Sequence, residues 1–336
     1  MAQTPMRHRL ILRAVRFGLW ALVCVVGLAG AQQLRLDDTP STEPPPETYQ
    51  RLPLTDAQQA TLRSAVESRQ YARAEDLLAA EAERQPKSQP LLTTVASIFF
   101  LDGKYLNCAV ALKKAEALAP LTDRQRFTLA LSYIVLNHRD WARPELEKLA
   151  AADSENPLYP YWLGRIDYDA MHFKAAVAHL QKALELSPTF MKAYDNLGLA
   201  YEGLGQYDEA IRVYQKAVDM NHSVAAPSPW LPLNLGTLLV KLEKLDEAKP
   251  YLEESLKYDP RFPKAHYQMG LLLEKQKNDD AALHELEDAA HSDPAYAEPH
   301  YLMGRIYTRR GEKSKADAEW QTFQKLKAEA PQERPH

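Results

Sequence analysis

Cysteine and glycine are scarce in this chain of 336 residues, and each shortage removes a class of protein. The chain has two cysteines, Cys24 and Cys108, which excludes a disulfide framework and any metal site built from pairs of thiolates. Twelve glycines are present, nine of them after residue 31, and they do not cluster as in phosphate-binding loops or dinucleotide fingerprints. We therefore expect no nucleotide and no other cofactor.

A concentrated basic surface is also missing. The 41 basic residues are outnumbered by 45 acidic ones, and residues 1–31 hold four of the arginines and no acid. The rest of the chain thus carries a net charge of −8. Nucleic-acid binding depends on clustered Lys and Arg, so we expect no nucleic-acid partner.

Catalytic and metal-binding motifs are incomplete. His284 and Glu285 begin like a zinc-protease motif, but the second histidine would fall at residue 288, which is Asp288. No serine lies in a nucleophile elbow. We expect a protein that is not an enzyme and that holds no metal.

The first 31 residues resemble an export signal. A basic stretch ends at Arg16, and an apolar run of about 15 residues follows over 17–31 and ends in Ala29-Gly30-Ala31. Since a spanning helix needs about 20 apolar residues, we predict a cleaved signal peptide and an exported, periplasmic or secreted protein. The alternative is a membrane anchor over residues 10–31, which would be the only link to a membrane. Residues 32–54 are rich in proline and predict a flexible linker.

What the chain does have is a repeat of 34 residues. A column of small residues recurs at this step, with one step of 38: Ala74, Cys108, Ala142, Ala176, Ala210, Ala248, Ala282 and Ala316. Eight units follow from it: 55–88, 89–122, 123–156, 157–190, 191–224, 229–262, 263–296 and 297–330. An insertion at 225–228 separates the fifth from the sixth, and 331–336 form a tail. This period predicts an all-α fold, an α-solenoid of stacked helix-turn-helix units.

The fifth unit shows how the residues would build a helix pair. Apolar residues at helical spacing predict two helices, and Gly205 between them predicts the turn. We expect Gly198 and Ala210 to meet where the two helices approach most closely. Pro188, Pro260 and Pro294 should end second helices in other units, because proline lacks the amide and clashes with the preceding turn.

These positions resemble the tetratricopeptide repeat (TPR) family. The match rests on Leu-Gly or Met-Gly at the seventh and eighth places and on alanine at the twentieth and twenty-seventh: Leu197-Gly198, Leu235-Gly236, Met269-Gly270, Met303-Gly304, Ala183, Ala217 and Ala289. It covers about four-fifths of the chain, with looser units at both ends. The resemblance implies a right-handed superhelix whose first helices line a concave groove. His266 and His300 occupy the fourth place, where a large packing residue is expected.

The resemblance also implies where a partner would bind. At the sixth place Asn196, Asn234 and Gln268 would form a column of amides able to hold the backbone of an extended peptide. The alternative is that polar residues simply fill exposed positions. With flanking aromatic and basic residues, the predicted partner-binding groove comprises Trp162, Arg165, Lys192, Asn196, Asn234, Lys264, Gln268, Tyr301 and Arg305.

Two further features refine this prediction. The family's carboxylate clamp is rejected, because Asp195 and Leu199 occupy the places of its first basic and amide residues. The insertion, with Pro227, Pro229 and Pro232 around it, predicts a hinge that divides the groove into two arms and shortens the helix that follows.

Taken together, these patterns predict a non-enzymatic adaptor of the cell envelope that holds an extended peptide or partner-protein segment in its groove. The alternative is a structural subunit of an envelope complex that assembles through its convex face or its ends.

Overall fold

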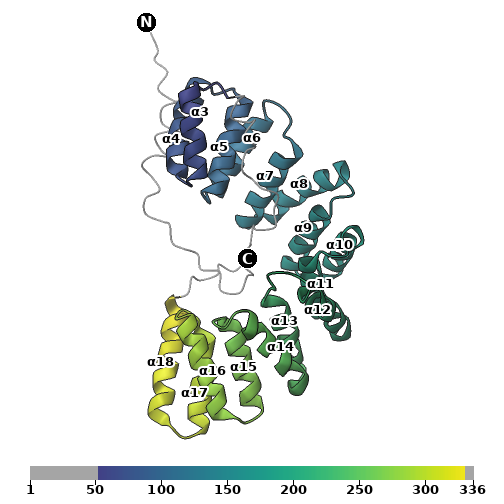
Figure 1. The fold of residues 1–336 in the computed structure, drawn as a ribbon, viewed down its shortest axis with the longest axis vertical. Coiled ribbons are helices and arrows are strands. Elements are labelled where there is room, and N and C mark those ends of the chain that lie inside the picture. The colour runs from purple at the N-terminus through teal and green to yellow at the C-terminus, as the bar shows by residue number, and fades with distance from the viewer. Residues whose placement is uncertain (1–51, 330–336) are drawn as a thin grey trace. The chain divides into compact units, whose positions relative to one another are not determined.

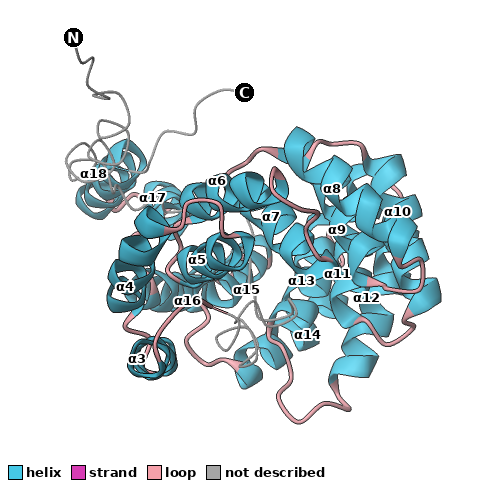
Figure 2. Ribbon diagram, turned by 90° about the horizontal axis from the view of Figure 1, so that it is seen from above, coloured by secondary structure: helices cyan, strands magenta, loops and turns pink. Residues whose placement is uncertain are grey.

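A computed structural model describes residues 52–329 of the chain, and these residues are all-helical. Figures 1 and 2 show helices joined by short loops, with no strand in the described range. The sixteen helices are, in chain order, α3 (Asp56–Glu67), α4 (Tyr71–Arg84), α5 (Gln89–Leu101), α6 (Tyr105–Glu116), α7 (Asp123–Val135), α8 (Arg139–Ala152), α9 (Leu158–Asp169), α10 (Phe173–Leu186), α11 (Met191–Gly203), α12 (Tyr207–Asn221), α13 (Trp230–Lys241), α14 (Leu245–Tyr258), α15 (Pro263–Lys275), α16 (Asp279–Ser292), α17 (Ala297–Arg309) and α18 (Lys313–Glu329). Each predicted unit contains one helix pair, which confirms the fold.

The described residues fall into two compact units. Residues 52–294 hold the seven pairs α3 to α16, and residues 295–329 hold the pair α17 and α18. Within the larger unit each second helix also contacts the first helix of the next pair, as α10 contacts α11 and α14 contacts α15. The pairs therefore stack in chain order, and each covers the apolar face that its neighbour leaves bare.

In every turn inside a pair, the residue at the fifteenth place of the repeat has a positive φ. Gly205 has a φ of 71°, as predicted for the turn in the fifth unit, and Gly103 and Gly311 are similar. The other five turns place residues with side chains in this left-handed region: Arg69, Asn137, Met171, Glu243 and Lys277, with φ between 56° and 65°. The turn geometry thus persists without glycine, because packing of the two helices imposes it against a modest steric cost.

Glycine at the eighth place permits close packing of the two helices of a pair. A methyl group on Gly198 would lie 2.3 Å from the ring of Tyr214, which is fully buried. Gly198 therefore faces the large residue at the twenty-fourth place, and at Gly164, Gly236 and Gly270 the carbonyl oxygen of the alanine at the twentieth place also lies within 3.4 Å of such a methyl group. Gly203, which no repeat position explained, packs in the same way against Phe173 of the preceding pair, at 2.6 Å.

Proline ends the second helices as expected. Pro188, Pro260 and Pro294 each follow a C-cap residue whose backbone is extended, with φ near −138°. Steric conflict between the proline ring and the preceding residue disfavours helical backbone there. The helix therefore stops one residue before the cap.

The insertion does not loosen the chain, and the predicted hinge is wrong. Asn221, fully buried at the end of α12, donates from Nδ2 to the Ser228 carbonyl oxygen at 2.9 Å and accepts from the Ser228 amide at 2.8 Å. One hydrophobic core runs through this joint and includes Tyr214 and Val218 before it and Leu231 and Leu235 after it. Helix α13, with 12 residues, is no shorter than α9. The repeats before and after the insertion thus share one core.

The predicted linker ends earlier than expected. Leu52 is buried in the core of the first pair together with Leu62 and Leu78, so the end of the 32–54 segment belongs to the folded unit. The signal peptide or anchor over 1–31 and the tail over 331–336 lie outside the described residues.

Candidate functional site

The predicted groove residues before position 295 all lie on first helices. Helix α9 contacts α11, and α13 contacts α15, so the first helices of neighbouring pairs share a surface. We call the exposed faces of α9, α11, α13 and α15 the first-helix surface. The four helices carry the predicted residues Trp162, Arg165, Lys192, Asn196, Asn234, Lys264 and Gln268.

Trp162 is not available as an anchor for a partner, which corrects its predicted role. Its side chain is only 3% exposed. It meets the Tyr161 ring edge-on, with the centroids 5.5 Å apart, and the Arg165 guanidinium lies 5.0 Å from its centroid. Tyr161 is itself buried against Phe190, and burial raises the pKa of its phenol. The aromatic residues of α9 therefore pack the interior of the stacked repeats. Arg165, which is half-buried, is the predicted residue of this helix that a partner could contact.

The predicted column of three amides is incomplete, because Asn196 is buried. Its side chain is 5% exposed, and Nδ2 donates to the Lys192 carbonyl oxygen at 2.8 Å, one turn back on α11. A side chain that is bonded to its own helix and covered by its neighbours is out of reach of the backbone of a bound peptide. The prediction for Asn196 is therefore wrong, and Lys192 remains half-buried beside it.

Asn234 has a different environment at the same place of the next repeat. Its Nδ2 donates to Oδ1 of Asp195 on α11 at 2.6 Å, and Asp195 is buried while Asn234 is half-buried. A hydrogen bond to a carboxylate is strong and fixes the orientation of the amide. An amide has two donor hydrogens and one acceptor oxygen, so the oxygen and one hydrogen are not used by Asp195.

Two further residues continue the first-helix surface on α15. Gln268 is half-buried at the sixth place, and Lys264 places its ammonium 4.9 Å from the centroid of the Trp230 ring on α13. Cations above an indole are held by the electrostatic field of the ring. Asn234, Lys264 and Gln268 are therefore brought onto neighbouring helices, as predicted.

Tyr301 and Arg305 lie on α17, in the unit of residues 295–329, and both are exposed. The Tyr301 ring packs 5.3 Å from the rings of Trp320 and Phe323 on α18. Phe323 and Trp320 of the last helix thus hold the Tyr301 ring in place.

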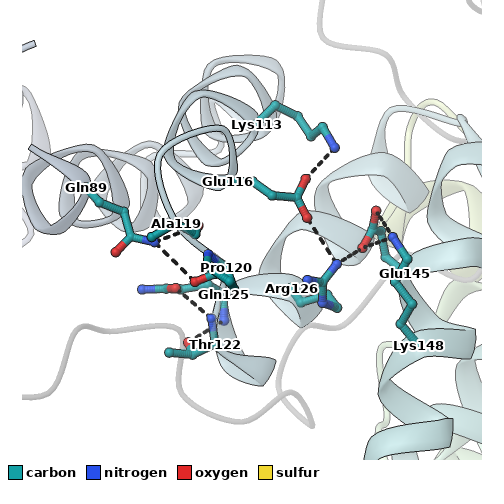
Figure 3. A network of polar contacts seen from close by, with 10 residues as sticks. All are labelled: Gln89, Lys113, Glu116, Ala119, Pro120, Thr122, Gln125, Arg126, Glu145 and Lys148. Atoms are coloured by element: carbon teal, nitrogen blue, oxygen red, sulfur yellow. Dashed lines mark hydrogen bonds and ion pairs between the residues drawn. The ribbon is translucent and has the colours of Figure 1, made fainter. Parts of the chain in front are cut away.

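Charged pairs inside the repeats are the feature that the sequence analysis missed. Figure 3 shows Arg126 of α7 between Glu116 of α6 and Glu145 of α8, with Lys113 and Lys148 at the edges. The hydrogen bond from Lys113 lowers the pKa of Glu116. Arg126 and Glu145 occupy the fourth and twenty-third places of their repeat. Opposite charges at these two places are the sequence signal that could have predicted the ion pair.

The same register recurs in the last two repeats. His266 Nδ1 lies 2.7 Å from Glu285 Oε2, and His300 Nδ1 lies 2.6 Å from Glu319 Oε2. The hydrogen bond to Glu285 raises the pKa of His266. The two histidines are therefore polar links between the helices of a pair, and the expectation of simple packing residues is wrong.

The thiol of Cys108 is buried. Cys108 is free and fully enclosed, and burial raises the pKa of its thiol to about 12. Because the thiolate is the reactive form, this residue packs the helix pair and does not attack a substrate at neutral pH.

Within residues 52–329, no helix is sufficiently long and apolar to cross a bilayer.

Comparison with known proteins agrees with this geometry. Residues 191–223 and 233–297 match families described as tetratricopeptide repeat, and residues 164–205 match one described as TPR repeat. The outer dynein arm-docking complex subunit 4 of Xenopus laevis is 28% identical over 28% of this chain and 18% of its own length. The TPR repeat-containing protein YpiA of Bacillus subtilis is 25% identical over 51% of this chain and 40% of its own. The chain thus spans less than half of either relative.

A solved structure shows the same architecture. A tetratricopeptide repeat protein from Parabacteroides merdae superposes with a TM-score of 0.61 over 77% of this chain and 99% of its own, at 16% identity. Proteins of this kind generally mediate protein–protein interaction and are typically scaffolds without catalytic activity. The repeated helix pairs, the glycine and alanine places and these matches agree: the chain belongs to the tetratricopeptide repeat family.

Proposed function

We propose that this protein is a non-enzymatic adaptor that holds an extended segment of a partner protein on its first-helix surface. The observation that carries the proposal is the bond between Asn234 and Asp195, which fixes an amide of α13 from the neighbouring helix α11. A fixed amide loses little conformational entropy when it binds. The family's general role in protein–protein interaction and the name of the Xenopus relative, a docking complex subunit, also support it.

The chemistry of the surface favours an extended polypeptide over a small molecule. A peptide backbone presents one N–H and one C=O per residue, which the unused oxygen and hydrogen of the Asn234 amide can match whatever the side chains. Gln268 offers a second amide on α15, and Lys264 offers a cation beside it. Each additional hydrogen bond is worth about 1 kcal/mol, so affinity would come from several contacts along the surface.

The experiment maps the contact surface and then perturbs it. Lysine crosslinking with mass spectrometry on the purified complex should give crosslinks from Lys192 and Lys264, which lie on first helices, in preference to lysines of second helices such as Lys182 and Lys257. The double variant Asn234→Ala/Gln268→Ala should weaken partner binding by about tenfold, which is the loss of about 1.4 kcal/mol. Unchanged affinity with an intact helical spectrum would sink the proposal.

The second candidate function, a structural subunit that assembles through the opposite face, is favoured by exposed apolar residues on second helices. Leu106 and Val110 on α6 are 59% and 47% exposed, and Trp141 on α8 is 56% exposed. Large apolar side chains in water mark interaction surfaces when they gather. Leu106→Ser/Val110→Ser is the matched variant: loss of the partner here, with binding retained in the Asn234 and Gln268 variant, would establish this function instead.

The cellular setting is part of the proposal. The basic and apolar composition of residues 1–31 favours export to the cell envelope. Fusion of residues 1–40 to a phosphatase that is active only after export should give activity, and N-terminal sequencing of the mature chain would locate cleavage near Ala31. A mature chain that still begins near residue 1 would favour the membrane-anchored alternative.

A further inference from the structure

Three metal-binding groups converge in the seventh repeat. His266 lies on α15, and Glu285 and Asp288 lie one turn apart on α16, the facing helix of the same pair. One ligand atom from each side chain lies within 4.8 Å of the other two. Within residues 52–329 this is the one group of three or more His, Cys, Asp or Glu side chains with such a spacing.

The orientation of the His266 ring is fixed by hydrogen bonds from both of its nitrogens. Its Nε2 lies 3.1 Å from the carbonyl oxygen of Pro260, which can only accept, so Nε2 carries a hydrogen and donates it. Nδ1 points at Glu285, which also accepts, and a bound ion would take the place of the hydrogen on Nδ1 while Nε2 keeps its bond to Pro260. Metal-bound histidines commonly donate their second ring nitrogen to a backbone carbonyl, because this bond fixes the tautomer and the ring orientation.

We propose that His266, Glu285 and Asp288 form a binding site for a divalent transition metal ion of the zinc class. One imidazole and two carboxylates are ligands that zinc accepts at about 2.0–2.2 Å, which places neighbouring ligand atoms about 3–3.5 Å apart. The separations in this structure, from 2.7 Å between His266 and Glu285 up to 4.8 Å, bracket that range. The imidazole disfavours calcium and magnesium, which take oxygen ligands.

The site is accessible from solvent. The Asp288 side chain is 46% exposed, so an ion can reach the site from solvent. His284, one turn before Asp288 on α16, places Nδ1 3.2 Å from its Oδ2. A bound ion would link α15, which carries Lys264 and Gln268, to α16, and would fix the helix pair at this end of the larger unit.

The last repeat contains a natural control for this site. His300 and Glu319 repeat the hydrogen bond of His266 and Glu285 at the same places, but Thr322 stands where Asp288 stands in the seventh repeat. The pair alone therefore serves to link two helices, and the third ligand distinguishes the seventh repeat. A site that depends on Asp288 is separable by mutation from the structural pair.

The experiment titrates the purified, chelator-treated chain with Zn²⁺ by calorimetry and with Co²⁺ by visible absorption. We expect one equivalent of Zn²⁺ and Co²⁺ d–d bands of a four-coordinate site with nitrogen and oxygen ligands. Asp288→Asn and His266→Gln should each weaken binding at least tenfold, while Glu319→Gln should leave it unchanged. Thr322→Asp should add a second equivalent by completing the site in the last repeat.

Each result decides the proposal. Helical circular dichroism of every variant establishes that loss of binding is not loss of folding. Absence of a stoichiometric ion in the wild-type chain would overturn the site. So would binding that survives both Asp288→Asn and His266→Gln, since it would come from other histidines of the chain.

Discussion

Replacing Gly198 by alanine tests how the helix pair of the fifth repeat is packed. The added methyl carbon would lie 2.3–2.6 Å from three atoms of the Tyr214 ring, whereas carbon atoms in contact prefer about 3.5–4.0 Å. Tyr214 cannot withdraw easily, because it is fully buried and its hydroxyl donates to Glu202 at 2.8 Å. The substitution must therefore separate α11 from α12 or displace the ring.

The magnitude follows from two opposing effects. Overpacking a buried site costs about 1–3 kcal/mol, and the short contacts place Gly198→Ala near 3. Alanine is better than glycine inside a helix by about 1 kcal/mol, so the expected net loss in the free energy of unfolding is about 2 kcal/mol. Gly304→Ala is the matched control: it gains the same propensity, but its methyl group would meet Trp320 at 3.0 Å or more, and we expect a change of less than about 1 kcal/mol.

A second substitution identifies the cause. The second and third repeats carry Ala96 with Leu112 and Ala130 with Leu146 at the eighth and twenty-fourth places, and all four are buried. Tyr214→Leu should therefore accommodate Gly198→Ala, because it recreates this natural pair.

Urea unfolding of the wild type, both single variants and the double variant gives a double-mutant cycle. We expect a favourable coupling of at least about 1 kcal/mol. Strictly additive effects, or a Gly198→Ala variant as stable as the wild type, would refute the packing argument.

Two other predictions concern buried polar groups. Cys108→Ala should hardly change stability at pH 7, because alanine occupies the same place in the other seven repeats. Burial raises the pKa of Cys108 from about 9 to about 12, so the unfolded chain loses this proton first and wild-type stability falls as pH rises from about 9 towards 12. Relative to the alanine variant, the loss should approach about 1.4 kcal/mol per pH unit above pH 9, and parallel pH profiles of the two proteins would contradict it. Asn221→Ala removes two hydrogen bonds to Ser228 and should lower the free energy of unfolding by about 2 kcal/mol. Amide hydrogen exchange over 222–229 should become faster. Unchanged exchange there would show that these two bonds do not hold the insertion in place.

The fold could be predicted because several places of the repeat require a particular kind of residue, such as a small residue for close packing or glycine for a turn. A period of 34, small residues at the twentieth place and glycine at Gly205 were sufficient to locate both helices of each pair. The joint at the insertion could not be predicted in the same way. Its proline content indicates a loose segment, but the buried Asn221 amide, which closes the loop through Ser228, looks in sequence like any polar residue at a helix end.

The sequence predicts which helix each candidate residue lies on, but not whether its side chain is buried or which hydrogen bonds it makes. Asn196 and Asn234 share the sixth place, so sequence alone gives them the same role. The structure separates them, because Asn196 bonds to its own helix and is covered, while Asn234 bonds across to Asp195 and stays half-buried. Asp195 itself appeared as the residue that excludes a carboxylate clamp, and its second role, as the acceptor that orients Asn234, depends on a contact 39 positions away.

The fourth and twenty-third places show how a repeat can acquire chemistry without changing its fold. Arg126 with Glu145, His266 with Glu285 and His300 with Glu319 are three solutions to one structural need, a polar link between the helices of a pair. Because the link is supplied by these two residues, the place one turn further along the second helix is free to vary. It holds Lys148, Asp288 and Thr322 in these three repeats. An acid at that place converts a link into a three-ligand cluster, and the stacked neighbours keep the backbone in place whichever residue occupies it. A new site can thus be gained or lost by one substitution, which is why Thr322→Asp is as direct a test of this reasoning as Asp288→Asn.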